Sequence, residues 1–107
     1  MPRTWQKVKK TREFKNITGS GKKYSTPAFL LFHLPSPLSS LGLIVSKKVG
    51  SAVKRNKVKR ILREVFSQIN PDQGDFVFIA RAEIKNYSYL EILGFLQKLF
   101  KKMVPNI

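Results

Sequence analysis

The side chains of this 107-residue sequence that could do chemistry are mostly cations: 21 lysines and arginines against six acids, a formal net charge of +15. A protein nuclease needs a general base, a nucleophile or two close carboxylates that hold metal ions. Only Asp72 and Asp75 lie near each other, and the spacing Asp-Gln-Gly-Asp is typical of a turn. His33, the one histidine, lies in an apolar run, and cysteine is absent. We therefore expect no catalytic residue and no metal ligand in the protein.

The cations are concentrated in two segments. Residues 47–63 contain eight basic residues and no acid, and residues 1–23 contain eight more. A solvated helix face usually mixes charges of both signs, because i,i+4 ion pairs then stabilise the helix. Cations at a helix N-terminus also oppose the helix dipole, and a bound anion would relieve that repulsion. A polyanion is therefore the expected partner.

The element that carries most of this charge is a long helix over residues 51–70. Apolar residues recur at positions 58, 61, 62, 65, 66 and 69, which places them on one helical stripe. Ser51 is a suitable N-cap, and Asn70 followed by Pro71 ends the helix. Asn56, Arg60 and Arg63 then lie opposite the apolar stripe, with Lys57 and Lys59 on either side. This pattern predicts a basic ridge that faces solvent.

The other elements are predicted from apolar runs and breakers. They are a helix over 11–18 capped by Thr11 and closed by Gly19, a loop over 19–23, strands over 28–34, 41–47 and 76–81, and a helix over 88–103 with a capping box at Ser88 and Glu91. This order, α-β-β-α-β-α, predicts an α+β fold, a single two-layer α/β sandwich in one domain over residues 1–107. Residues 1–10 are expected to be a mobile basic N-terminus, in which Trp5 is either a loose anchor or an RNA contact.

Residues 41–64, LGLIVSKKVGSAVKRNKVKRILRE, closely resemble the corresponding segment of the bacterial ribonuclease P protein component. The upstream Arg-Glu-Phe of residues 12–14 and the downstream GDFVFIAR of residues 74–81 agree, and the resemblance covers essentially the whole chain. It implies a left-handed β-α-β crossover through the basic helix, whereas nearly all such connections are right-handed. One departure is Lys57, which stands where the family has arginine, and lysine does not reproduce a bidentate guanidinium contact.

The resemblance implies the small subunit of a ribonucleoprotein whose RNA removes the 5′ leader from precursor tRNA. It implies no cofactor on the protein alone, with Mg²⁺ held at the active site of the RNA. The residues implied to bind the catalytic RNA are Lys47, Lys48, Lys54, Arg55, Asn56, Lys57, Lys59, Arg60 and Arg63. The residues implied to bind the leader, in a cleft between the first helix and the sheet, are Lys10, Arg12, Phe14, Lys15, Thr18 and Phe32. Phe32 lies inside an apolar strand and is equally suited to the core, and Thr18 stands where many relatives have an aromatic residue.

Two other classes of protein share part of this pattern. A ribosomal-type RNA-binding protein without catalytic function would have the charge but not the long motif. A peripheral membrane protein would need an apolar wedge on the exposed face of its basic helix, and this helix has none. No apolar run approaches the roughly 20 residues that cross a bilayer. We expect a cytoplasmic protein whose partners are RNA, with no membrane and no DNA.

Overall fold

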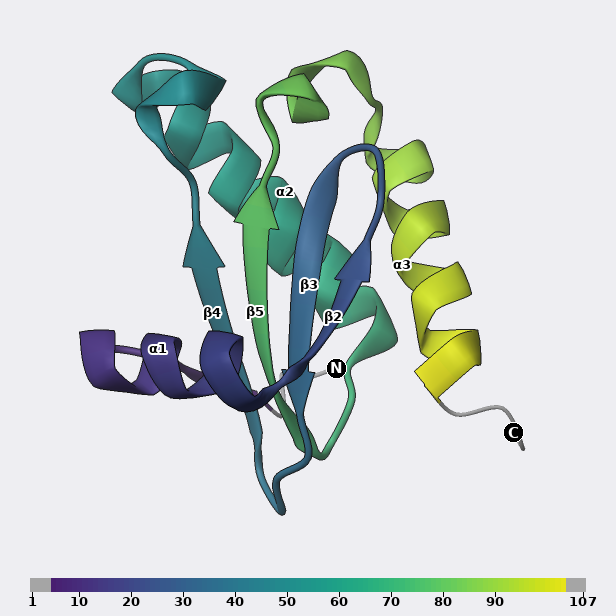
Figure 1. Cartoon of the computed structure of the whole chain (residues 1–107). Coiled ribbons are helices and arrows are strands. Elements are labelled where there is room, and N and C mark those ends of the chain that lie inside the picture. The colour runs from purple at the N-terminus through teal and green to yellow at the C-terminus, as the bar shows by residue number, and fades with distance from the viewer. Residues whose placement is uncertain (1–4, 104–107) are drawn as a thin grey trace.

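The computed structural model describes residues 5–103, which form a five-stranded mixed sheet with the strand order β1-β4-β5-β3-β2 (Figure 1). The strands are β1 (Gln6–Lys7), β2 (Lys22–Ser25), β3 (Phe29–Leu34), β4 (Ser39–Ile44) and β5 (Gly74–Ala80). β4 is parallel to β1 and β5, and β3 is antiparallel to β5 and β2. On the central strand, Phe76 pairs with Leu41 of β4 and with His33 of β3.

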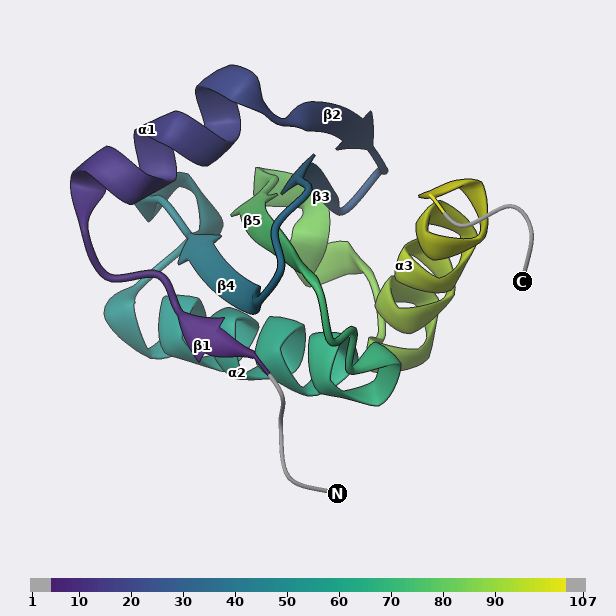
Figure 2. The same ribbon diagram turned by 90° about the horizontal axis from the view of Figure 1, so that it is seen from below.

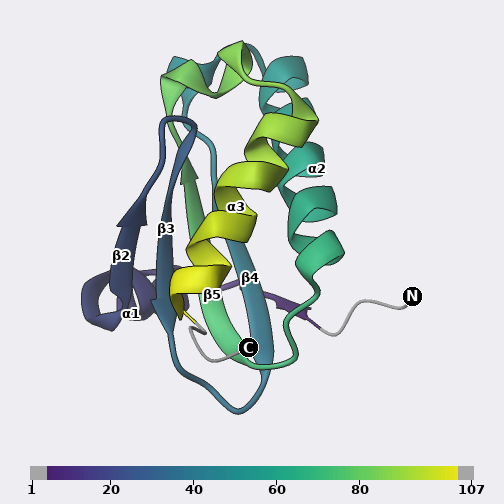
Figure 3. The same ribbon diagram turned by 90° about the vertical axis from the view of Figure 1, so that its right-hand side faces the viewer.

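The α-helices lie on both faces of the sheet. α1 (Thr11–Ser20) crosses one face, whereas α2 (Ala52–Ile69) and α3 (Tyr89–Met103) cover the other (Figures 2 and 3). Two short 3-10 segments, η1 (Lys47–Val49) and η2 (Ala82–Asn86), precede α2 and α3 respectively. The helical layer of the predicted sandwich is formed by α2 and α3. The six predicted elements occur in the predicted order, which confirms the α+β fold.

Alternation along the strands divides the apolar side chains between two clusters. The larger cluster lies beneath α2 and α3, where the ring of Phe66 contacts Phe76 and Phe78 with centroids 5.1 and 5.9 Å apart. The smaller cluster lies beneath α1 and includes Phe32 and Val77. Because β3 and β5 are covered on both faces, both strands are apolar at nearly every position.

The connection from β4 through α2 to β5 is left-handed. With β4 and β5 running upward in Figure 1, β5 lies to the right of β4, and α2 passes behind the sheet. Figure 2 shows the same arrangement from below, with α1 and α2 on opposite sides of the strands. The prediction of a left-handed crossover is therefore confirmed.

Local capping explains where α2 and α3 begin and end. Ser51 Oγ accepts a hydrogen bond from the Lys54 N–H at 3.4 Å, and Asn70 closes α2 in the left-handed conformation, with φ 47° and ψ 56°. The Ser88 N–H donates to Glu91 Oε1 at 3.0 Å and the Glu91 N–H donates to Ser88 Oγ at 3.2 Å. The predicted bounds of the basic helix and the predicted capping box are thus confirmed.

The N-terminal segment differs from the prediction of a mobile residue range 1–10. Residues 1–4 lie outside the described residues, but residues 5–10 contain β1, and the Val8 N–H donates to the Leu41 carbonyl at 2.9 Å. Trp5 is only 5% exposed. Burial of the indole and pairing with β4 hold this segment on the protein, so the prediction is wrong for residues 5–10.

Four predicted bounds near α1, β2 and β4 are also wrong. Thr11 is the first residue of α1 rather than its cap, and Lys10 at the cap makes no side-chain hydrogen bond. The helix continues past Gly19 to Ser20, because the Gly21 N–H closes it on the Ile17 carbonyl at 2.8 Å. The predicted loop over 19–23 overlaps β2, and β4 ends at Ile44 rather than at residue 47. Within residues 5–103, no helix is long and apolar enough to span a membrane.

Candidate nucleic-acid interface

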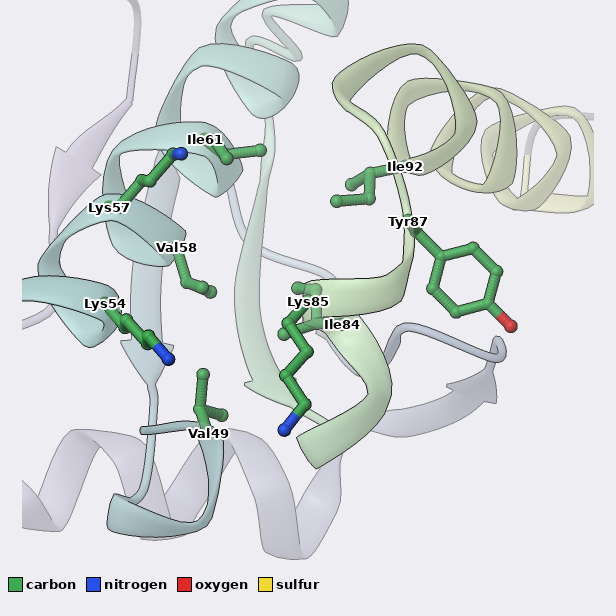
Figure 4. Close-up of a pocket in the computed structure, with 9 residues that line it drawn as sticks. All are labelled: Val49, Lys54, Lys57, Val58, Ile61, Ile84, Lys85, Tyr87 and Ile92. Atoms are coloured by element: carbon green, nitrogen blue, oxygen red, sulfur yellow. The ribbon is translucent and has the colours of Figure 1, made fainter. Parts of the chain in front are cut away.

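The cations of α2 are distributed over three sides of the helix. Half-buried Lys59 and Arg63 line a groove toward β1 and α1. Lys54 and Lys57 line a separate hollow toward η2 (Figure 4). Arg60 is exposed and lines neither of these two cavities. Of the residues predicted to form the solvent-facing basic ridge, Asn56 and Arg60 are exposed, whereas Arg63 lies in the groove.

The groove between α1 and α2 has a volume of about 370 Å³. Four elements contribute to it, and its lining residues are Trp5, Lys7, Val8, Phe14, Leu41, Leu43, Lys59 and Arg63. Lys7 belongs to the N-terminal group of cations, whereas Lys59 and Arg63 belong to the group on α2. The fold thus brings the two cationic segments of the sequence to one groove, and no acid lines it.

Phe14 supplies the aromatic surface of this groove. Its ring lies against Gly42 of β4, where an added Cβ would come within 2.5 Å of Phe14 Cε1. The ring is half-buried and packs against the apolar cluster beneath α1, so one side contacts the sheet and part of it remains accessible. Gly42 is therefore required for this close approach, and it sets the height of the ring above the sheet.

The other residues predicted to bind the leader are placed differently. Phe32 is 9% exposed within the cluster beneath α1, so the structure favours the core interpretation for it. The Thr18 hydroxyl donates to the Phe14 carbonyl at 3.0 Å, one helical turn back. Lys10, Arg12 and Lys15 are exposed on or next to α1 and do not line the groove.

Trp5 anchors the N-terminal segment to the protein. The sequence alone left open whether this residue is an anchor or an RNA contact. Its Nε1–H donates to Ser67 Oγ on α2 at 3.2 Å, and its ring meets Phe66 edge-on with centroids 6.0 Å apart. These contacts hold β1 between β4 and α2. Lys7 is thereby brought to the groove, although nothing in its own sequence context marked it as a site residue.

Arg55 is half-buried at the start of α2, and its Nε is buried without a hydrogen-bond partner. Within residues 5–103, Ser39 Oγ is the other buried side-chain atom in this state. Buried polar atoms normally have a partner, and a guanidinium suits a phosphate oxygen better than a neutral acceptor. Arg55 thus has one buried guanidinium N–H without a partner in the part of the chain that the structure describes.

The side chains of Asp75 and His33 make contacts within the fold. Asp75 Oδ1 accepts from the Ser40 hydroxyl at 2.6 Å, whereas Asp72 is exposed. His33 stacks on Phe76 with centroids 4.7 Å apart, and burial lowers the pKa of His33 from its ordinary 6.5, an effect that the Asp75 carboxylate opposes. No group of three or more metal-ligating side chains occurs in the part of the chain that the structure describes.

The family model described as Ribonuclease P matches residues 1–104 of this chain. The chain belongs to the ribonuclease P protein family. It is 39% identical over 101 residues to the ribonuclease P protein component of Caldanaerobacter subterraneus subsp. tengcongensis, covering 90% of this chain and 87% of the relative. It is 38% identical over 104 residues to that of Shouchella clausii, covering 91% and 84%.

Solved structures of ribonuclease P proteins have the same fold. A Staphylococcus aureus RNase P protein mutant, described as defective in mRNA degradation activity, superposes with a TM-score of 0.81 at 31% identity, covering 91% of this chain and 86% of that one. The Thermotoga maritima RNase P protein superposes with a TM-score of 0.78 at 28% identity, covering 91% and 96%.

Ribonuclease P membership confirms the resemblance and the role in tRNA 5′ processing that it implied. The chain is a protein component of bacterial ribonuclease P, a tRNA-processing endonuclease, and it acts in tRNA 5′ processing with the RNA subunit. Its partners are therefore the ribonuclease P RNA and the tRNA substrate. The ribosomal-type alternative is excluded.

Within this ribonuclease P protein, the structure gathers some predicted residues and separates others. Phe14, Lys59 and Arg63 meet at the groove, whereas Lys54 and Lys57 lie at the hollow. Lys47 and Lys48 are exposed in η1, and Asn56 and Arg60 are exposed on α2. The sequence did not indicate Lys7, Val8, Gly42 and Leu43 as site residues. The apolar spacing of Trp5 and Val8 in a basic segment was the available indication that residues 5–8 pack on the protein.

Proposed function

We propose that this chain is an auxiliary subunit and that the RNA subunit performs the cleavage. Support comes from the side chains themselves: the acids are dispersed or hydrogen-bonded, and half-buried His33 is stacked on Phe76. The protein alone is proposed to bind no cofactor. Mg²⁺, held at the active site of the RNA, would supply the activated nucleophile and stabilise the leaving group.

The groove between α1 and α2 is proposed to hold the single-stranded 5′ leader. The observation that carries this proposal is the placement of Phe14 with Lys7, Lys59 and Arg63 around one cavity. Single strands bind where cations contact the phosphates and an aromatic ring stacks on a base, a contact worth about 1–3 kcal/mol per base.

The exposed and half-buried residues of α2 outside the groove are proposed to bind the RNA subunit. Arg60 and Asn56 face solvent, and Arg55 is half-buried beside them at the start of the helix. Lys47 and Lys48 extend this cationic surface beyond the start of the helix. The leader and the RNA subunit would then contact neighbouring sides of one helix, which places the leader next to the catalytic RNA.

Reconstitution tests this division of labour. A bacterial ribonuclease P RNA is incubated with precursor tRNA at low Mg²⁺, with and without this chain, and the chain is also incubated with precursor tRNA alone. The expected result is faster leader removal when the RNA and the chain are combined, and no cleavage by the chain alone. Cleavage by the chain alone would overturn the proposal, and so would an unchanged rate for the RNA.

A further inference from the structure

A second cavity lies on the side of α2 opposite the groove, between α2 and η2 (Figure 4). It has a volume of about 260 Å³ and receives residues from η1, α2, η2 and α3. The lining residues are Val49, Lys54, Lys57, Val58, Ile61, Ile84, Lys85, Tyr87 and Ile92. We call this cavity the lysine-rimmed hollow. The leader groove does not include it, and its rim residues Lys54 and Lys57 belong to the side of α2 proposed above to bind the RNA subunit.

The floor of the lysine-rimmed hollow is aliphatic. Val49, Val58, Ile84 and Ile92 are core residues with exposed fractions of 2, 8, 2 and 1%, and half-buried Ile61 adds to them. The Tyr87 hydroxyl points away from the hollow (Figure 4). The accessible apolar surface of the floor therefore comes mainly from Ile61, Val58 and the ring of Tyr87, and the Val and Ile side chains offer no hydrogen-bonding group.

The rim of the hollow is cationic. Lys54 and Lys57 reach it from α2 and Lys85 reaches it from η2, and all three are exposed (Figure 4). The stem of Lys54 lies over Gly50, where an added Cβ would come within 2.9 Å of Lys54 Cδ. Gly50 has φ 147°, a conformation that glycine tolerates best, so the backbone itself makes room for this lysine. No acid lines the hollow.

An apolar floor with a cationic rim complements a ligand that has a flat apolar part and an anionic part. We propose that the lysine-rimmed hollow binds one unstacked nucleotide of RNA, with the base on the aliphatic floor and its phosphate against Lys54, Lys57 and Lys85. RNA offers such a group where a base of a single-stranded loop or bulge is splayed out of its stack. The volume lies below the roughly 300 Å³ at which pockets for drug-sized ligands begin, which suits a single nucleotide. The inference rests on the proposed function only in taking RNA as the partner.

The test uses the full-length chain with labelled methyl groups, in a chloride buffer free of phosphate, and follows the valine and isoleucine signals by NMR. The probes are adenosine 5′-monophosphate, adenosine, inorganic phosphate and an acidic peptide. Adenosine 5′-monophosphate is expected to shift the floor methyls of Val58, Ile84 and Ile92 saturably, adenosine to shift them more weakly, and inorganic phosphate to leave them unchanged. Floor methyls that respond equally to inorganic phosphate, that do not saturate, or that respond more strongly to the acidic peptide would overturn the proposal.

A matched pair of charge reversals adds a second measurement. Lys85→Glu removes a rim cation, whereas Lys98→Glu makes the same change at an exposed lysine of α3 that does not line the hollow. Lys85→Glu is expected to weaken binding of adenosine 5′-monophosphate about fivefold, the effect of one charge contact at the surface, and Lys98→Glu to change it little. Equal effects of the two variants would overturn the proposal. Because this assay needs neither precursor tRNA nor the RNA subunit, its failure is separate from a failure of the reconstitution.

Discussion

Replacing Phe14 with leucine separates base stacking from packing at the leader groove. The ring lies over Gly42 and above the cluster that contains Phe32, so part of its surface is buried and part faces the groove. Leucine keeps an apolar side chain against the sheet but has no aromatic face. The variant Phe14→Leu should therefore lose the stacking contact while retaining most of the stability of the fold.

The expected loss follows from one base stacked on one ring. Such a contact is worth about 1–3 kcal/mol, which corresponds to about 5- to 150-fold in affinity. The assay compares the affinity of the reconstituted enzyme for precursor tRNA with its affinity for mature tRNA. Phe14→Leu should weaken binding of the precursor by this factor and leave binding of mature tRNA unchanged.

Phe32→Leu is the matched control, because it makes the same chemical change at a ring that is 9% exposed in the same cluster. It should lower the melting temperature through lost packing, while the advantage of precursor over mature tRNA is retained. The reasoning is refuted if Phe14→Leu weakens the binding of precursor tRNA and of mature tRNA equally. It is also refuted if Phe32→Leu reduces the leader-dependent part of the affinity as strongly as Phe14→Leu does.

Three further predictions concern the surroundings of the groove, the exposed face of α2 and half-buried His33. Gly42→Ala places a Cβ within 2.5 Å of Phe14 Cε1, so the ring must move; we expect reduced precursor affinity and a cost of about 1–3 kcal/mol in the free energy of unfolding, and unchanged values in both assays would contradict this. Arg60→Ala should weaken binding to the ribonuclease P RNA and lower the salt dependence of that affinity by about one ion contact; an unchanged slope would show that Arg60 is merely solvated. Because burial lowers the pKa of His33 in the folded protein, the unfolded chain binds more protons, and stability should fall as the pH decreases below about 6.5. The loss of melting temperature between about pH 7.5 and about pH 5.5 should therefore be smaller in His33→Gln than in the unsubstituted protein, and equal losses would contradict the prediction.

The long helix α2 could be predicted from the sequence because its determinants are local. Ser51 caps it, Asn70 and Pro71 end it, and the apolar stripe from Val58 to Ile69 repeats at helical spacing over about three turns. β1 and β2 could not be predicted in the same way. β1 has only two residues, both exposed, and it exists because Trp5 is buried against α2 and because β4 offers an open edge. Such tertiary causes leave no periodic pattern in the segment itself.

The charge of the candidate site could be predicted from the sequence, but its division into the leader groove and the lysine-rimmed hollow could not. Helical projection placed Lys57 and Lys59 on either side of the basic ridge, and the structure agrees. Projection cannot show what each side faces: α1 and β1 turn one side into the leader groove, and η2 turns the other into the lysine-rimmed hollow. Phe32 shows the same limit, since an apolar run on a strand covered on both faces gives no information on which rings remain accessible.

Cross-linking from the leader tests the central claim most directly. Precursor tRNA with a photoreactive uridine in its leader is bound to the reconstituted enzyme and irradiated, and the cross-linked peptides of this chain are identified. The account predicts cross-links to the two walls of the leader groove, at Lys7, Val8 and Phe14 on one side and at Lys59 and Arg63 on the other. Cross-links confined to α3, to η2 or to the exposed face around Arg60 would contradict it.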